Sequence, residues 1–155
     1  MRKRALSVLA VAVAVGLVST VLFAPAASAR PRVHEARLTG EKEIGTEGDA
    51  NGRGTAVITT QWKKRRVCFT LGWRRLGPVV AAHIHVGGRR VAGDVVVPLY
   101  TGAELPRYVN ALGGCIKNVD RTLIGRINRN PQGYYVNIHT RGYPDGAIRG
   151  QLRVA

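Results

Sequence analysis

The sequence predicts an all-β fold, an antiparallel sandwich or barrel, with one short helix near residues 118–129. Short β-branched runs recur along the chain, turn residues separate them at regular spacing, and only one stretch has helical periodicity. We expect a single domain over residues 30–155, with its core at about 37–152, because a chain of that length buries a core of its own.

Residues 1–29 have the composition of an export signal. A positive segment at residues 2–4 precedes an apolar run at residues 5–24, and Ala27-Ser28-Ala29 supplies the small residues of a cleavage site. We therefore expect cleavage before Arg30 and a secreted protein, either extracellular or associated with the cell wall. The alternative is an uncleaved anchor, since about 20 apolar residues suffice to span a bilayer. We expect no membrane span after cleavage.

The first half of the domain predicts three strands. Residues 34–44 alternate loosely and end in a turn rich in Gly, Asp and Asn. Residues 54–61 are rich in β-branched side chains, and a charged bend at 63–66 joins them to a partner strand at 67–73. A hairpin is therefore expected here.

The second half predicts two strands that carry histidine, at residues 79–86 and 134–140, and a short buried strand at 94–99. Residues 100–131 interrupt this pattern. Asn118 is placed to cap the short helix, because the apolar residues after it follow at helical spacing: Val119, Leu123, Ile124 and Ile127. A tight turn at 142–146 then leads into the last strand.

Each histidine strand has one apolar and one polar face, because alternate side chains of a strand point to opposite sides. His83 and His85 therefore share a face, and Asn137 shares one with His139. If the last strand lies in the same sheet, it adds two further polar side chains. The predicted polar face then consists of His83, His85, Asn137, His139, Arg149 and Gln151.

Three interpretations of this polar face are open. A His-x-His pair with a third imidazole from a neighbouring strand supplies the three ligands of an open zinc or copper site: His83, His85 and His139. Alternatively, the histidines form a structural hydrogen-bonded network with Asn137, Arg149 and Gln151. The third interpretation is a small anionic ligand, and Arg149 disfavours a cation by charge repulsion. Apart from copper or zinc, no cofactor is expected.

Cys68 and Cys115 are the two cysteines of the chain. An even pair in an exported protein predicts one disulfide, and two buried free thiols are the alternative. The bridge would close a loop of 48 residues, counted inclusively. On the chain-entropy model it would contribute about 4 kcal/mol at most to stability.

The chain is strongly basic, with a formal net charge of +15. Removal of residues 1–29 takes away three cationic and no acidic side chains, which leaves 21 against nine and a net charge of +12. Such a charge predicts salt-sensitive attraction to polyanions, and a solubilising surface is the alternative. We expect an acidic cell-wall polymer or polysaccharide as partner, and no specific nucleic acid. The candidate residues are Lys63, Lys64, Arg65, Arg66, Arg89 and Arg90.

Several motifs occur in the order typical of one family. They include Leu38-Thr39-Gly40 with Glu43, Ala82-His83-Ile84-His85, Val95-Val96-Val97-Pro98-Leu99, Tyr135-Val136-Asn137-Ile138-His139-Thr140 and Gly146-Ala147-Ile148-Arg149-Gly150-Gln151-Leu152. On these motifs the chain resembles the CHRD (chordin) domain, which also occurs in bacterial secreted proteins, over about residues 37–152. The resemblance implies an all-β, immunoglobulin-like or barrel-like (superoxide-dismutase-like) extracellular module without established catalytic activity. Growth-factor antagonism is not implied, because the chain lacks the cysteine-rich modules that carry it in chordin.

The expected function is therefore a secreted, non-enzymatic module that binds or adheres at the cell surface through a basic face, or alternatively a histidine-face metal-binding protein. Neither a Gly-x-Ser-x-Gly elbow nor a P-loop occurs in the sequence. A vaguer likeness to copper–zinc superoxide dismutase rests on the His-x-His strand, but its later ligands have no match, so we expect no dismutase activity. Trp62 and Trp73 flank a hairpin, and we expect them to pack across its strands.

Overall fold

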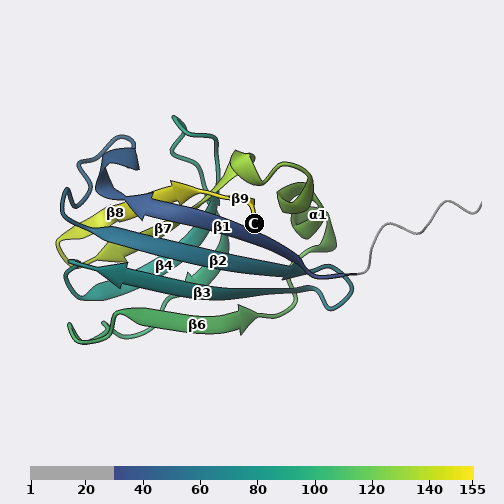
Figure 1. Cartoon of the computed structure of the whole chain (residues 1–155), viewed down its shortest axis with the longest axis horizontal. Coiled ribbons are helices and arrows are strands. Elements are labelled where there is room, and N and C mark those ends of the chain that lie inside the picture. The colour runs from purple at the N-terminus through teal and green to yellow at the C-terminus, as the bar shows by residue number, and fades with distance from the viewer. Residues whose placement is uncertain (1–29) are drawn as a thin grey trace, which may run out of the picture.

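The computed structural model describes residues 30–155, so the predicted export signal lies outside the described residues. The described part of the chain folds into β-strands with one short α-helix (Figure 1). The strands are β1 (Arg32–Thr39), β2 (Arg53–Gln61), β3 (Arg66–Arg74), β4 (Val79–Val86), β5 (Val95–Tyr100), β6 (Ala111–Ile116), β7 (Tyr134–Thr140), β8 (Tyr143–Gln151) and β9 (Arg153–Val154). The helices are α1 (Arg121–Arg129) and the 3-10 turns η1 (Gly40–Lys42) and η2 (Pro131–Gly133).

The strands form one antiparallel sheet in the order β5-β4-β7-β8-β1-β2-β3-β6, with β9 paired to β1. The sheet curls until it is nearly closed into a barrel, so that β4 and β7 lie behind β1 and β2 in Figure 1. The prediction of an all-β antiparallel fold with one short helix is confirmed.

The barrel interior is aliphatic and aromatic. Alternate residues of each strand point inward, and the side chains of Ile58, Leu71, Ile84, Ile138 and Ile148 are completely buried. Ile124 and Ile127 of α1 are equally buried and close one end of the barrel. Period-two alternation in the strands and helical spacing in α1 therefore supply a single core.

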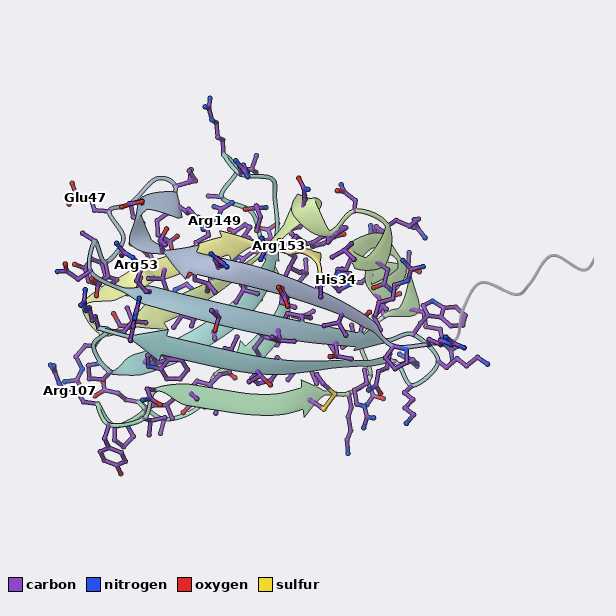
Figure 2. The ribbon with its side chains drawn as sticks, viewed as in Figure 1. His34, Glu47, Arg53, Arg107, Arg149 and Arg153 are labelled. Carbon is purple, nitrogen blue, oxygen red and sulfur yellow. A yellow bond between two sulfur atoms is a disulfide. The ribbon has the colours of Figure 1, made fainter. Side chains whose placement is uncertain are left out.

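A strand that the sequence did not predict lies at one edge of the sheet. Residues 111–116 were expected to be outside the β pattern, but they form β6 and pair with β3. Two glycines lower the strand propensity of this segment. The ring of Phe69 covers Gly114, where an added Cβ would lie 3.2 Å from the ring, and this contact explains the glycine. Cys68 lies directly opposite Cys115 in this pair, and the predicted disulfide joins them (Figure 2).

Helix α1 begins two residues later than predicted. Asp120, and not Asn118, is its N-cap, because the Asp120 carboxylate accepts a hydrogen bond from the Thr122 amide. Asn118 instead has a positive φ of 60° and makes the turn between β6 and the helix. At the other end of the helix, Asn128 Oδ1 accepts hydrogen bonds from Thr60 Oγ1 at 2.6 Å and His34 Nε2 at 2.9 Å, which ties α1 to β1 and β2. His34, the fourth histidine, is thus structural.

Two strand boundaries differ from the prediction. The first strand ends at Thr39, and residues 40–52, here called the flap, fold back over the outside of the sheet. The flap is held by a hydrogen bond from the Asp49 amide to the Ala147 carbonyl of 2.8 Å. The last hairpin is tighter than expected, because β8 already begins at Tyr143.

The expected packing across the hairpin describes Trp73 but not Trp62. Trp73 pairs with Gly54 at the far end of the hairpin and is buried in the core. Trp62 lies in the bend between β2 and β3, where it is 48% exposed and the Arg121 guanidinium lies 5.2 Å from its ring centroid.

Candidate metal centre and basic surface

The predicted polar face exists because the two histidine strands and the last strand are neighbours. β7 lies between β4 and β8, and the register aligns His83 with Asn137 and Arg149. The next row aligns His85 with Tyr135 and Gln151. These side chains point away from the barrel core, so the structure brings all six predicted polar-face residues together on the outer surface of the sheet.

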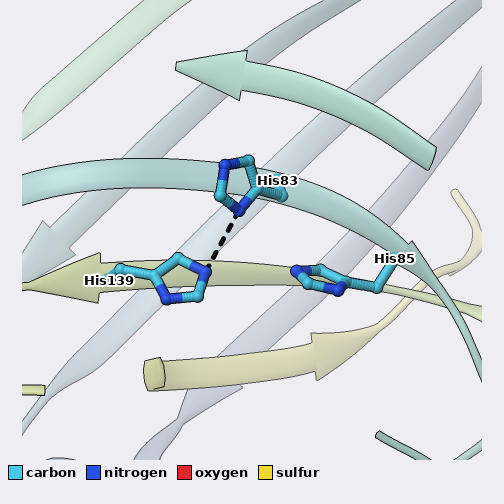
Figure 3. A group of neighbouring side chains, drawn as sticks. All are labelled: His83, His85 and His139. Carbon is cyan, nitrogen blue, oxygen red and sulfur yellow. Dashed lines mark hydrogen bonds between the residues drawn. The ribbon is translucent and has the colours of Figure 1, made fainter. Parts of the chain in front are cut away.

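The imidazoles of His83, His85 and His139, here called the histidine cluster, converge on one point (Figure 3). One ligand nitrogen from each ring lies within 4.8 Å of the other two. His83 Nδ1 and His139 Nε2 are 3.2 Å apart, and the ring centroids of His83 and His85 are 5.6 Å apart. Two residues spaced by two on β4 and one on β7 therefore form a compact group.

Backbone carbonyls fix the tautomers of two of these rings. His139 Nδ1 lies 2.8 Å from the Pro144 carbonyl, and His85 Nδ1 lies 2.8 Å from the Gly93 carbonyl. A carbonyl only accepts, so each Nδ1 carries the proton and each Nε2 presents a lone pair. His85 Nε2 is buried and has no hydrogen-bond partner within residues 30–155. This is the arrangement that metal-binding histidines have, with the second nitrogen donating to a carbonyl.

All three histidines are held in the neutral form. Burial lowers the pKa of His83 to about 4, with further lowering from His139 and His85. Burial also lowers the pKa of His85 and of His139, partly offset by their hydrogen bonds to Gly93 and Pro144. Neutral imidazole is the form that binds a metal ion, so near neutral pH the cluster needs no deprotonation to do so.

Two segments cover the outer face. The flap lies on one side, and residues 87–93, here called the roof loop, lie on the other. Side chains of the outer face bind the roof loop by its carbonyls: Gln151 donates to Gly87, Arg149 to Gly88 and Val91, and His85 to Gly93. The loop turns back tightly at Gly93, where an added Cβ would lie 1.8 Å from the Val86 carbonyl oxygen. His85 and His139 are consequently buried. His83 is half-buried and lies on the side of the cluster that is open to solvent.

The buried cation on this face is separated from the histidines by an aromatic ring. The Arg149 guanidinium carbon lies 3.4 Å from the ring centroid of Tyr135, and the His85 ring stacks on Tyr135 with centroids 4.8 Å apart. Because His85 comes from β4 and Arg149 from β8, the tyrosine of β7 stands between them. Carbonyls of the roof loop also compensate the guanidinium charge. These contacts reduce the repulsion expected between Arg149 and a bound cation.

Glu43 is a further member of the outer face that the sequence reasoning did not assign. The flap places Glu43 next to Asn137, and Asn137 Nδ2 donates a hydrogen bond of 3.2 Å to Glu43 Oε2. Gly146 makes this approach possible, since an added Cβ would lie 2.7 Å from Glu43 Oε2. Burial raises the pKa of Glu43 to about 7, against the lowering effect of Arg149 and of the Asn137 hydrogen bond. The only sequence signal was its place in the family motif.

The donor set and its spacing fit a metal ion. Tetrahedral ligands at about 2.0–2.1 Å from a zinc ion place their nitrogens roughly 3.3 Å apart. The His83–His139 pair already has this spacing at 3.2 Å, and the remaining separations, at most 4.8 Å, would have to shorten by up to about 1.5 Å through rotation of the side chains. Three imidazoles leave a fourth position open on the His83 side.

The predicted basic residues fall into two separate groups. Lys63, Lys64 and Arg65 are exposed in the bend between β2 and β3, and Arg66 bonds Gln61 Oε1 from the first residue of β3. Arg89 and Arg90 are exposed at the tip of the roof loop and line a hollow of about 410 Å³. No residue of the bend lines that hollow.

The comparison with family models identifies the family of the chain. The family model for the CHRD domain matches residues 34–152, and the chain belongs to this family. No curated protein and no solved structure matches the chain. Within residues 30–155, no helix is both long and apolar enough to cross a bilayer.

Proposed function

We propose that this CHRD domain is a non-enzymatic metal-binding module, and that His83, His85 and His139 hold one zinc or copper ion. The observation that carries the proposal is the pair of carbonyl-fixed rings. His85 and His139 both direct an unprotonated Nε2 into the cluster, and the His85 atom is buried without a partner among the described residues. Imidazole is a ligand for both zinc and copper, and the open fourth position suits either ion.

A purely structural network accounts for less of this geometry. Without a metal, His83 Nδ1–H donates to His139 Nε2, which satisfies both atoms. His85 Nε2 then remains buried and unpaired, at a cost of about 1–3 kcal/mol. A metal ion would engage all three nitrogens, and His83 would move its proton from Nδ1 to Nε2. The two interpretations therefore differ in what happens when metal is added.

The experiment is a titration of the chelator-stripped protein with Zn²⁺ and with Cu²⁺, in which calorimetry measures the binding. We expect one ion per chain for the natural sequence and loss of that binding in the double variant His83→Ala/His85→Ala. His34→Gln is the matched control, because His34 lies outside the cluster and bonds only Asn128 through its Nε2. Equal weak uptake by the natural protein and the double variant would eliminate the proposal.

A second candidate function is adhesion to an acidic extracellular polymer after export. It is supported by the net charge of +12 left when residues 1–29 are excluded. The disulfide fits an oxidising, extracellular environment. Retention on an anionic resin should fall steeply as salt rises, and retention that is independent of salt would contradict it. Export is tested by the mass of protein recovered outside the cell, which should correspond to a chain starting at Arg30.

A further inference from the structure

Two hollows on the outer surface of the barrel share one arginine. The first, of about 410 Å³, lies between the flap, β1, β9 and the roof loop, and its cationic residues are Arg37, Lys42, Arg89, Arg90 and Arg153. The second hollow, of about 540 Å³, lies over the start of β2 and the ends of β1 and β3. Its cationic residues are Arg37, Arg53 and Arg74. Because Arg37 lines both, the two hollows form one continuous surface, here called the cationic track. Arg53 and Arg153 are labelled in Figure 2.

The charge of the track is largely uncompensated. Glu41 is the single acidic residue among those lining either hollow. Arg153 is partly paired, with its guanidinium 3.5 Å from the exposed Glu35 carboxylate. Burial and the neighbouring charges of Arg89, Arg37 and Arg153 lower the pKa of Lys42, against the opposing effect of Glu41. These cations therefore act on one another, and an anion placed among them would relieve their repulsion.

Paired strands and a hydrogen-bonded loop fix the backbone from which these cationic side chains extend. Arg37 and Arg53 lie on the paired strands β1 and β2. Arg89 and Arg90 lie on the roof loop, whose carbonyls at Gly88 and Val91 accept hydrogen bonds of 2.8 and 2.9 Å from buried Arg149. The bend at Lys63 and Lys64 differs, because it is an exposed turn that borders neither hollow. Preorganised charge binds an anionic ligand with a smaller loss of conformational entropy than charge on flexible side chains alone.

We propose that the cationic track binds a linear acidic polysaccharide, with successive carboxylate or phosphate groups contacting the two hollows on either side of Arg37. This inference rests on the polymer adhesion suggested above and locates it on one surface. The lining residues favour a polysaccharide over single-stranded nucleic acid. Bases need exposed aromatic rings on which to stack, whereas the one aromatic residue lining the track, Trp73, is buried. Exposed Trp62 and Tyr108 line neither hollow.

The test measures binding of the domain to polygalacturonate at two salt concentrations, using two variants that each lose four charges. The track variant is Arg37→Gln/Arg89→Gln/Arg90→Gln/Arg153→Gln, and the matched bend variant is Lys63→Gln/Lys64→Gln/Arg65→Gln/Arg66→Gln. We expect the track variant to lose affinity by roughly tenfold or more and to show a shallower salt dependence, whereas the bend variant changes by less than about threefold. Thermal melting of both variants confirms that they are folded.

The possible results separate this inference from the function on which it rests. Equal losses of affinity in the two variants would overturn the proposed role of the cationic track, because net charge alone would then account for binding. Failure of the natural domain to bind polygalacturonate would overturn both the track and the adhesion function. Tighter binding to single-stranded DNA than to polygalacturonate at the same salt would make nucleic acid the occupant and overturn the proposed ligand.

Discussion

The two faces of the β4-β7-β8 segment are both buried, but they are buried by different means. On the inner face, Ile84, Val136, Ile138 and Ile148 are packed by the other strands of the barrel. On the outer face, His139, Asn137 and Arg149 are 8%, 3% and 1% exposed, because the flap and the roof loop lie over them. The inner face is mainly apolar, and Thr140, in phase with Val136 and Ile138, is a polar exception whose buried Oγ1 has no partner among the described residues. The outer face retains buried polar atoms without a partner in the described chain: His85 Nε2, Asn137 Oδ1, Glu43 Oε1 and Arg149 Nε.

This difference indicates what each face is for. A sheet that needed only stability would cover its second face with apolar side chains, since buried polar groups are costly unless they are hydrogen-bonded. The outer face instead keeps three neutral imidazoles and covers them with two loops. We therefore expect stability to depend mainly on the inner face, and the proposed metal binding to depend on the outer one.

The largest expected effect is on the inner face. Ile138→Ala should lower the free energy of unfolding by about 2–5 kcal/mol, because it leaves a cavity in a completely buried site. Its neighbour on the other face, His139→Ala, should change stability less and abolish metal binding. Denaturant unfolding and metal titration of both variants measure this contrast. A loss of stability that is equal for the two would contradict the division between the faces.

The disulfide should affect stability and leave the outer face unchanged. Cys68→Ala/Cys115→Ala removes the bridge between β3 and β6, and we expect a loss of up to about 4 kcal/mol of unfolding free energy. The histidine cluster lies on β4 and β7, which the bridge does not join. Metal affinity measured well below the unfolding temperature should therefore stay within about twofold of the natural protein. A large change in affinity would mean that the edge strand supports the cluster.

The smallest effect is a dependence of stability on pH that groups of the outer face produce between about pH 4 and 7. The pKa of His83 is lowered from 6.5 to about 4, so its contribution is present above pH 6.5 and is lost as the pH falls toward 4. The pKa of Glu43 is raised from 4.5 to about 7, so its contribution is complete below pH 4.5 and is lost as the pH rises through 7. Arg149 and Asn137 are the groups that face Glu43 and oppose this shift.

These two dependences oppose each other between about pH 4.5 and 6.5, and single variants separate them. Glu43→Gln should leave a metal-free protein whose urea midpoint rises steadily from pH 4 to 6.5. His83→Gln should weaken that rise and expose the fall toward pH 7 that Glu43 produces. A Glu43→Gln variant that retains the fall toward neutral pH would show that another group is responsible.

The sequence predicted the alternation of the strands and the side chains that share a face, because these depend on local geometry alone. It also predicted the disulfide, which follows from two cysteines in a chain that is expected to be exported. It did not predict that the polar face is covered, since the flap and the roof loop are held by long-range bonds such as those of Arg149 to Gly88 and Val91. For the same reason, the role of Glu43 and the bonds of His34 and Thr60 to Asn128 were missed.

Local propensity also misled where a tertiary contact decides the structure. The segment 111–116 contains two glycines, yet pairing with β3, the disulfide and the Phe69 ring make it a strand. Asn118 is a good helix cap by composition, but its left-handed backbone places Asp120 at the helix start instead. The contacts that make residues 111–116 a strand come from residues distant in sequence. The start of the helix depends on the backbone angle of Asn118, which composition does not specify.

A crystal structure of the domain soaked with zinc, with anomalous scattering recorded at the metal edge, tests the central claim most directly. The account predicts one strong peak on the outer face, about 2.0–2.1 Å from a nitrogen of each of His83, His85 and His139. It also predicts that Gly93 and Pro144 still accept from the remaining nitrogens of His85 and His139. A map with no peak at the cluster, and with the His83–His139 hydrogen bond intact, would contradict it.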